Sequence, residues 1–124
     1  MSFSEEALYN QKGLDVDAAL EFVGDIDLYR EILYDYYEDI DPKCERVEEY
    51  IKTRNAKEYT VEVHAIKSAS RTIGATELSQ RALLLEQYGE AEDWDAILRE
   101  TPGVLETYKG YKDIVSPYMV KAEE

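Results

Sequence analysis

The sequence predicts an all-α fold, an up-down four-helix bundle with additional short N-terminal helices. Apolar residues recur at three- and four-residue spacing along most of the chain, which is typical of helices that bury one face. Glycine and proline are scarce, at 6 and 3 of 124 residues, and no stretch alternates as a strand would. A chain of this length fits one domain with one core, so we expect a single domain over residues 1–124.

Two short helices are predicted first. Residues 4–12 have Ser4 as an N-terminal cap and acids in the first turn, and Gly13 ends the segment. Asp15 is placed to cap a second helix, which Gly24 ends. We therefore expect both segments to flank the longer helices.

A long helix is predicted next, capped by Asp25 or Asp27. Proline lacks a backbone donor and disfavours the α conformation in the residue before it, so we expect a kink or a one-turn break at Asp41–Pro42. The helical pattern then resumes and fades at residues 53–55. Its apolar stripe consists of Leu28, Ile32, Leu33, Tyr36, Tyr37, Ile40, Val47, Tyr50 and Ile51.

Two further helices are predicted on either side of a tight turn. Asn55 followed by Glu58 has the spacing of a capping box, and Gly74 ends the helix that begins there because a left-handed residue costs least for glycine. Residues 75–90 follow at once, which implies an antiparallel pair. The expected core residues are Tyr59, Val63, Ile66, Ser70 and Ile73, then Leu78, Ala82, Leu85 and Gly89, with Leu83, Leu84 and Tyr88 widening the second apolar side.

The last helix is expected to begin at Thr101–Pro102, because proline is favoured at the first helical position. Before it, Asp93 is expected to cap a short turn of its own, and near the end Pro117 is expected to loosen the last turn. The apolar stripe of this helix consists of Val104, Leu105, Tyr108, Tyr111, Ile114, Val115 and Tyr118.

Composition and charge argue against several classes of function. One cysteine, Cys44, allows no internal disulfide, and we interpret it as a half-buried residue without a role in a reducing compartment. A net charge of −14 argues against binding nucleic acid or an anionic membrane through a basic field. No apolar run approaches the ~20 residues of a membrane span, and the start lacks a signal-peptide pattern, so we expect a cytoplasmic protein.

The chain has one histidine, His64, and it lies in a stretch whose polar residues have no place in the expected core. At helical spacing His64, Lys67, Ser68 and Arg71 share a polar flank turned away from the expected core. From residue 63 to 85 three cations accompany one acid, in an otherwise acidic chain. Chance clustering of solvated charges is the alternative, but its coincidence with the histidine favours a site.

An unperturbed imidazole is a nucleophile at neutral pH without further activation. A phosphoryl group placed on it carries about two negative charges, which Lys67 and Arg71, one and two turns further on, could neutralise. No second histidine completes a metal site, and no serine or cysteine with a paired base completes a hydrolase triad. The favoured chemistry is phosphoryl acceptance without a metal or other cofactor in the chain.

The helix after the tight turn brings a further group to the same level. His64 lies ten residues before Gly74 and Glu86 twelve residues after it, so both stand about 15–18 Å from the turn. Glu86 or its neighbour Gln87 could therefore orient the imidazole ring by hydrogen bonding. The sequence leaves open which of the two faces it.

The stretch His64–Ala75 reads His-Ala-Ile-Lys-Ser-Ala-Ser-Arg-Thr-Ile-Gly-Ala. It resembles the motif His-x-Leu-Lys-Gly-[Ser/Ala]-[Ser/Ala]-x-x-[Ile/Leu]-Gly-Ala of histidine-containing phosphotransfer (HPt) domains. The segment from Gly13 to Tyr29 resembles the N-terminal part of the same family, so the likeness covers about residues 13–118, the expected core of the domain. The clearest departure is Ser68, where the family usually has glycine.

The resemblance implies a relay protein whose exposed histidine accepts a phosphoryl group from a receiver-domain aspartate and passes it to another. It implies that His64 is the phospho-acceptor and Lys67 its charge-neutralising neighbour, with Glu86 at a position where several members have glutamine. The implied partners are response-regulator receivers, which supply Mg²⁺ and the aspartate, and a hybrid histidine kinase. We expect a monomeric phosphocarrier without kinase activity of its own.

Two other functions stay open at this point. A binding-only module would dock on a receiver without carrying phosphate, and Ser68 together with Glu86 motivates this alternative. An acidic mimic of nucleic acid is suggested by the net charge of −14 and the eleven tyrosines, but the basic residues around His64 count against it. The phosphorelay carrier is the favoured hypothesis.

Overall fold

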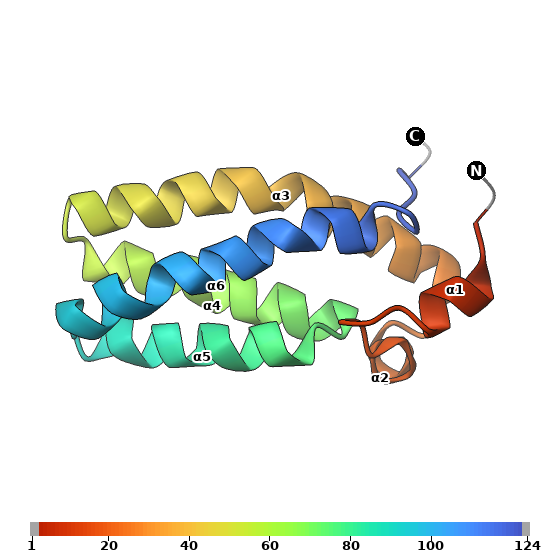
Figure 1. Ribbon diagram of the computed structural model, residues 1–124, viewed down its shortest axis with the longest axis horizontal. Helices are drawn as coiled ribbons and strands as arrows, with labels where there is room; N and C mark the ends of the chain where they lie inside the picture. The colour runs from red at the N-terminus through yellow and green to blue at the C-terminus, as the bar shows by residue number, and fades with distance from the viewer. Residues whose placement is uncertain (1–2, 123–124) are drawn as a thin grey trace.

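The computed structural model describes residues 3–122, which form six helices and no strand. The predicted all-α class is therefore confirmed. Four long helices lie side by side along one axis, and two short ones cover the end where both termini lie (Figure 1). The elements are α1 (Glu5–Tyr9), α2 (Val16–Val23), α3 (Ile26–Lys52), α4 (Ala56–Ile73), α5 (Thr76–Glu90) and α6 (Trp94–Val115).

Most helices begin where the capping chemistry predicts. Four side chains each accept a hydrogen bond of 3.1 Å from the backbone N–H three residues later. These caps are Ser4, Asp15, Asn55 and Asp93. Asp25, not Asp27, caps α3. Helix α1 is shorter than predicted, because it ends at Tyr9 with Asn10 as its C-terminal cap.

Two prolines lie inside helices instead of interrupting them. The predicted break at Asp41–Pro42 is wrong because α3 continues through it, and the predicted helix start at Thr101–Pro102 is wrong because α6 already begins at Trp94. Both prolines are exposed, and buried residues continue on the opposite side of each helix. The burial of this helix side, both before and after each proline, stabilises the helix by more than the one hydrogen bond that the proline removes. The buried residues are Ile40, Cys44 and Val47 in α3 and Ile97, Thr101 and Val104 in α6.

The predicted core stripes of α4 and α5 are buried, including the one polar member, Ser70. Its hydroxyl lies 2.8 Å from the hydroxyl of Tyr36, so this buried pair satisfies itself. Cys44 is fully rather than half buried, and burial raises the pKa of its thiol to about 11. Leu83 and Leu84 are exposed instead of widening the core, because the buried line of α5 is narrow.

The turn between α4 and α5 is pressed against the residue that begins α2. Gly74 has a left-handed φ of 87°, and its carbonyl accepts a hydrogen bond of 2.8 Å from the N–H of Asp15. A side-chain carbon on Gly74 would overlap the backbone of Asp15. One residue earlier, the carbonyl of Ile73 accepts a hydrogen bond of 2.7 Å from the buried Tyr29 hydroxyl. The Asp15 contact places the start of α2 against the C-terminal end of α4, and the Tyr29 hydrogen bond joins α3 to the same end.

Replacing Gly74 by alanine tests this contact. The change adds left-handed strain of about 1–2 kcal/mol and an overlap that costs about 1–3 kcal/mol, so the free energy of unfolding should fall by roughly 2–5 kcal/mol in urea titrations. Gly24→Ala is the matched control, since Gly24 has a φ of 83° but open space around the added carbon. The control should lose only the strain; equal losses would show that Gly74 is not pressed against Asp15.

Candidate functional site

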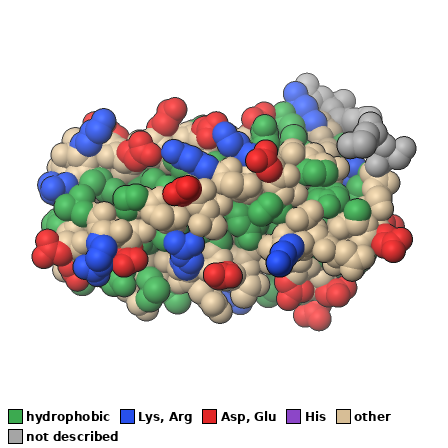
Figure 2. All heavy atoms as spheres, in the orientation of Figure 1, with side chains coloured by type: hydrophobic (Ala, Val, Ile, Leu, Met, Phe, Trp, Pro, Cys, Tyr) green, Lys and Arg blue, Asp and Glu red, His purple; other side chains and the backbone are tan. Residues whose placement is uncertain are grey.

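His64 lies on the outer side of α4, with 55% of its side chain exposed. The same helical phase that buries Val63 and Ile66 turns His64 outward. No histidine is visible on the face that α3, α6 and α5 present in Figure 2, where acidic and basic side chains are interspersed. The predicted exposure of His64 is therefore what the structure has.

Glu86 of α5 joins His64 to Lys67. One carboxylate oxygen, Oε2, lies 2.7 Å from Nδ1 of His64, and the other, Oε1, lies 2.6 Å from Nζ of Lys67. The Glu86 side chain is only 13% exposed. The alternative that the sequence left open is thus resolved in favour of Glu86, since Gln87 is exposed and makes no side-chain hydrogen bond among the described residues.

The contact between α4 and α5 sets which residue of α5 faces the histidine. The Ser79 hydroxyl donates to the carbonyl of Lys67 at 2.9 Å. Near the other end of α5, Gly89 packs so closely on α4 that a side-chain carbon there would overlap the Thr60 hydroxyl. With both ends of α5 fixed, Glu86 points along α4 toward His64 and Lys67, and Gln87 is rotated by about 100° away from them.

The charge of Glu86 determines where the imidazole carries its proton. Burial raises the pKa of Glu86, but the hydrogen bonds from Lys67 and His64 outweigh burial and leave that pKa below its ordinary value. An ionised carboxylate only accepts hydrogen bonds, so Nδ1 of His64 must donate. In the neutral ring Nε2 then keeps its lone pair, and it has no hydrogen-bond partner among the described residues.

The other predicted site residues lie near this cluster but outside it. Ser68 is exposed one turn after His64. Arg71 is exposed as well, and its guanidinium carbon lies 5.6 Å from the ring centre of Phe22. Together with Thr72, these residues line an open depression of about 310 Å³ beside the histidine. Arg71 therefore contacts α2 rather than joining His64 and Glu86.

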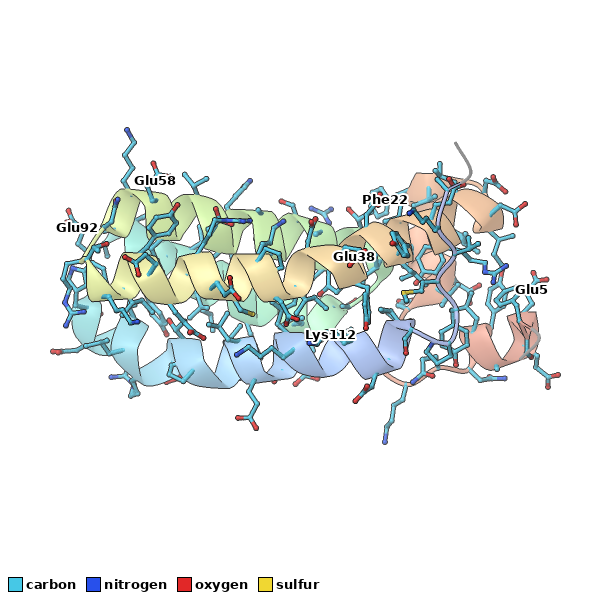
Figure 3. All side chains as sticks on the ribbon, turned by 90° about the horizontal axis from the view of Figure 1, so that it is seen from above. Glu5, Phe22, Glu38, Glu58, Glu92 and Lys112 are labelled. Carbon is cyan, nitrogen blue, oxygen red and sulfur yellow. The ribbon has the colours of Figure 1, made fainter. Side chains whose placement is uncertain are left out.

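Phe22 is the residue near the site that the sequence prediction missed. It lies outside the apolar stripe of α2 and is 68% exposed. Figure 3 places it near the end of α4 that is remote from Glu58. The available signal was an aromatic residue off the stripe of a short amphipathic helix, which has no core position to fill.

No other feature of the described residues competes with this cluster. Among residues 3–122 no group of three His, Cys, Asp or Glu side chains could hold a metal ion. A hollow of about 760 Å³ lies where the α3–α4 connection and the start of α4 meet the end of α5, and neither His64 nor Glu86 lines it. None of the helices that the structure describes is long and apolar enough to cross a membrane.

Replacing Glu86 by alanine should change the imidazole tautomer. For the neutral form of the ring, the ring ¹⁵N shifts should report Nδ1–H in the unaltered chain and mainly Nε2–H in Glu86→Ala, because the carboxylate acceptor is gone. His64 is the one histidine, so its resonances need no further assignment. Gln87→Ala is the control and should keep Nδ1–H; a tautomer unchanged in Glu86→Ala would contradict the hydrogen bond.

Comparison with known proteins gives one match. The Hpt domain family model matches residues 31–110, from within α3 to within α6, and so includes His64, Lys67 and Glu86. No curated protein and no solved structure matches the chain. Hpt domains are phosphotransfer modules of two-component systems, and the match covers well over half of the 124 residues. The chain therefore belongs to the Hpt domain family.

Proposed function

We propose that this protein relays phosphoryl groups between receiver-domain aspartates, with Nε2 of His64 as the acceptor. The observation that carries the proposal is the 2.7 Å contact between Glu86 and Nδ1 of His64. It leaves the Nε2 lone pair free on a ring that is 55% exposed, where a partner can reach it. Membership of the Hpt domain family supports the same chemistry.

The transfer needs no proton to be removed from this chain. The Nε2 lone pair forms the N–P bond while the bond from phosphorus to the aspartyl oxygen breaks, and the aspartate carboxylate leaves with the electron pair. Nδ1 keeps its proton and continues to donate a hydrogen bond to Glu86. A general base is therefore unnecessary, and in this proposal the chain is a phosphocarrier without kinase activity, while the receiver supplies aspartate and Mg²⁺.

Cationic and hydroxyl groups on α4 would stabilise the added charge. Lys67 lies one turn after His64 on the same flank and carries an ammonium group. Ser68 adds an exposed hydroxyl that can donate to a phosphoryl oxygen, which suits it to the position in spite of the usual glycine. Arg71 lies a further turn away and, stacked on Phe22, is better placed to contact the partner than the phosphoryl group.

Exposed apolar side chains mark a docking face around the histidine. Val61 lies three residues before His64 on α4, Leu83 three residues before Glu86 on α5, and Phe22 projects from α2. Residues three apart on a helix lie on the same side, so these side chains border the cluster. We propose that a monomer of this up-down bundle docks one receiver, or the receiver of a hybrid histidine kinase, on this face.

Transfer from phosphorylated receivers of the same organism tests the proposal directly. We expect an acid-labile, alkali-stable phosphoryl group on the chain, and none on His64→Gln, because that substitution removes the Nε2 nucleophile. Circular dichroism should be unchanged, since the His64 side chain is exposed. Label that persists in His64→Gln, or receivers that bind both forms equally without any transfer, would contradict the relay and favour a module that only binds.

The docking face is tested separately from the chemistry. Phe22→Ala should weaken receiver binding by roughly 5–30-fold in calorimetry, since truncation of a central aromatic contact costs about 1–2 kcal/mol. Leu98→Ala is the control, because Leu98 is an exposed apolar residue of α6, a helix that carries none of the residues of the His64 cluster. Equal affinities for Phe22→Ala and Leu98→Ala would remove α2 from the interface.

A further inference from the structure

The Glu86 carboxylate divides its two oxygens between two donors. Oε1 accepts from Lys67 at 2.6 Å and Oε2 accepts from Nδ1 of His64 at 2.7 Å. Lys67 and His64 are three residues apart on one helix, so a group attached to the ring lies within reach of the same ammonium. The cluster therefore contains one cation that two anions can share, once a phosphoryl group is present.

The charges around His64 indicate that Lys67 is the cation that an added phosphoryl group would attract. In the resting state the Lys67 ammonium and the Glu86 carboxylate neutralise each other. A phosphoryl group brings about two negative charges and three acceptor oxygens, more than the single charge of Glu86. On the flank of α4 that carries His64, the other cation, Arg71, is stacked on Phe22 of α2. From α3 the ion pair of Arg46 with Glu62, at 3.1 Å, neutralises itself, and on α5 Glu90 lies one turn beyond Glu86.

We infer that phosphorylation of His64 transfers the Lys67 ammonium from Glu86 to the phosphoryl group, and that Glu86 then holds the Nδ1 proton and keeps the phosphorylated ring cationic. This inference rests on the proposed function. After the transfer the Nδ1–H group is the one close donor left to the Glu86 carboxylate within the cluster. Loss of that proton would leave a carboxylate facing a nitrogen lone pair, which is unfavourable for both.

Retention of this proton determines how readily the phosphoryl group leaves. When Nδ1 carries a proton, the N–P bond breaks with its electron pair returning to Nε2, and the leaving group is neutral imidazole. When Nδ1 has lost its proton, the leaving group is an imidazolate anion, which is a far stronger base and leaves much less readily. Glu86 would therefore be a positioning residue that extends rapid transfer to the next receiver aspartate toward higher pH.

Four titrations test the inference without any receiver. Phosphoramidate, a small-molecule donor to histidine, is used to phosphorylate the whole chain, and the ring resonances of His64 are followed by NMR against pH, with and without the phosphoryl group. Glu86→Gln keeps the size and one acceptor oxygen of Glu86 but removes its charge. We expect this change to lower the titration midpoint of the phosphorylated ring by about one pH unit, a tenfold change in proton affinity, and that of the free ring by clearly less.

The controls separate this mechanism from simpler ones. Glu90→Gln removes the same charge one turn further along α5, from a residue with no hydrogen bond or ion pair among the described residues, and should move neither midpoint appreciably. If Glu86→Gln lowered the titration midpoints of the free and the phosphorylated ring equally, the inferred transfer of the Lys67 ammonium to the phosphoryl group would be overturned. Failure of phosphoramidate to label His64 would overturn it as well, by showing that Nε2 is not free. A chain that phosphoramidate labels but receivers do not would contradict the proposed relay alone.

Discussion

The tight turn at Gly74 is the constraint on which the candidate site depends. Because this residue is left-handed and lies against the backbone of Asp15, α5 must start at a fixed point and run back along α4. The same contact fixes the start of α2, which brings Phe22 beside Arg71. Relative to this turn His64 and Glu86 lie at nearly equal heights, so their pairing follows from chain geometry before any attraction between the two groups acts.

The exposed face of α4 could be predicted from the sequence, whereas the choice of its partner could not. Helical period alone separates Ile66 from His64 and places Lys67 beside the histidine. The choice between Glu86 and Gln87 needs the rotation of α5 about its own axis. That rotation is set by the Ser79 contact and by close packing at Gly89, which are tertiary interactions without a local signal in the sequence.

The errors at the prolines have the opposite cause, because local rules were given too much weight there. Pro102 is favourable at the start of a helix, yet Asp93 already provides a side-chain cap nine residues earlier. The buried residues on both sides of Pro102 lie on one continuous side of α6, and separate helices would have to give up that burial. Continuity of the apolar stripe across a proline was therefore the better predictor.

Arg71 shows a related limit of sequence-based prediction. Helical phase gives the flank on which a long side chain lies, but it does not give the group that the side chain contacts.

The placement of Glu86 also bears on whether this chain only binds its partners. A carboxylate with 13% exposure loses much of its hydration, and two donors must compensate for that loss. Both donors come from the outer flank of α4, and one of them is the ring of the exposed histidine. For a face used only for docking, the tautomer would decide only whether Nε2 accepts or donates a hydrogen bond, and a partner could be matched to either. A nucleophile gains directly, because only one tautomer leaves Nε2 with its lone pair. Glu86, at a position where several family members have glutamine, is thus an argument for phosphoryl transfer rather than against it.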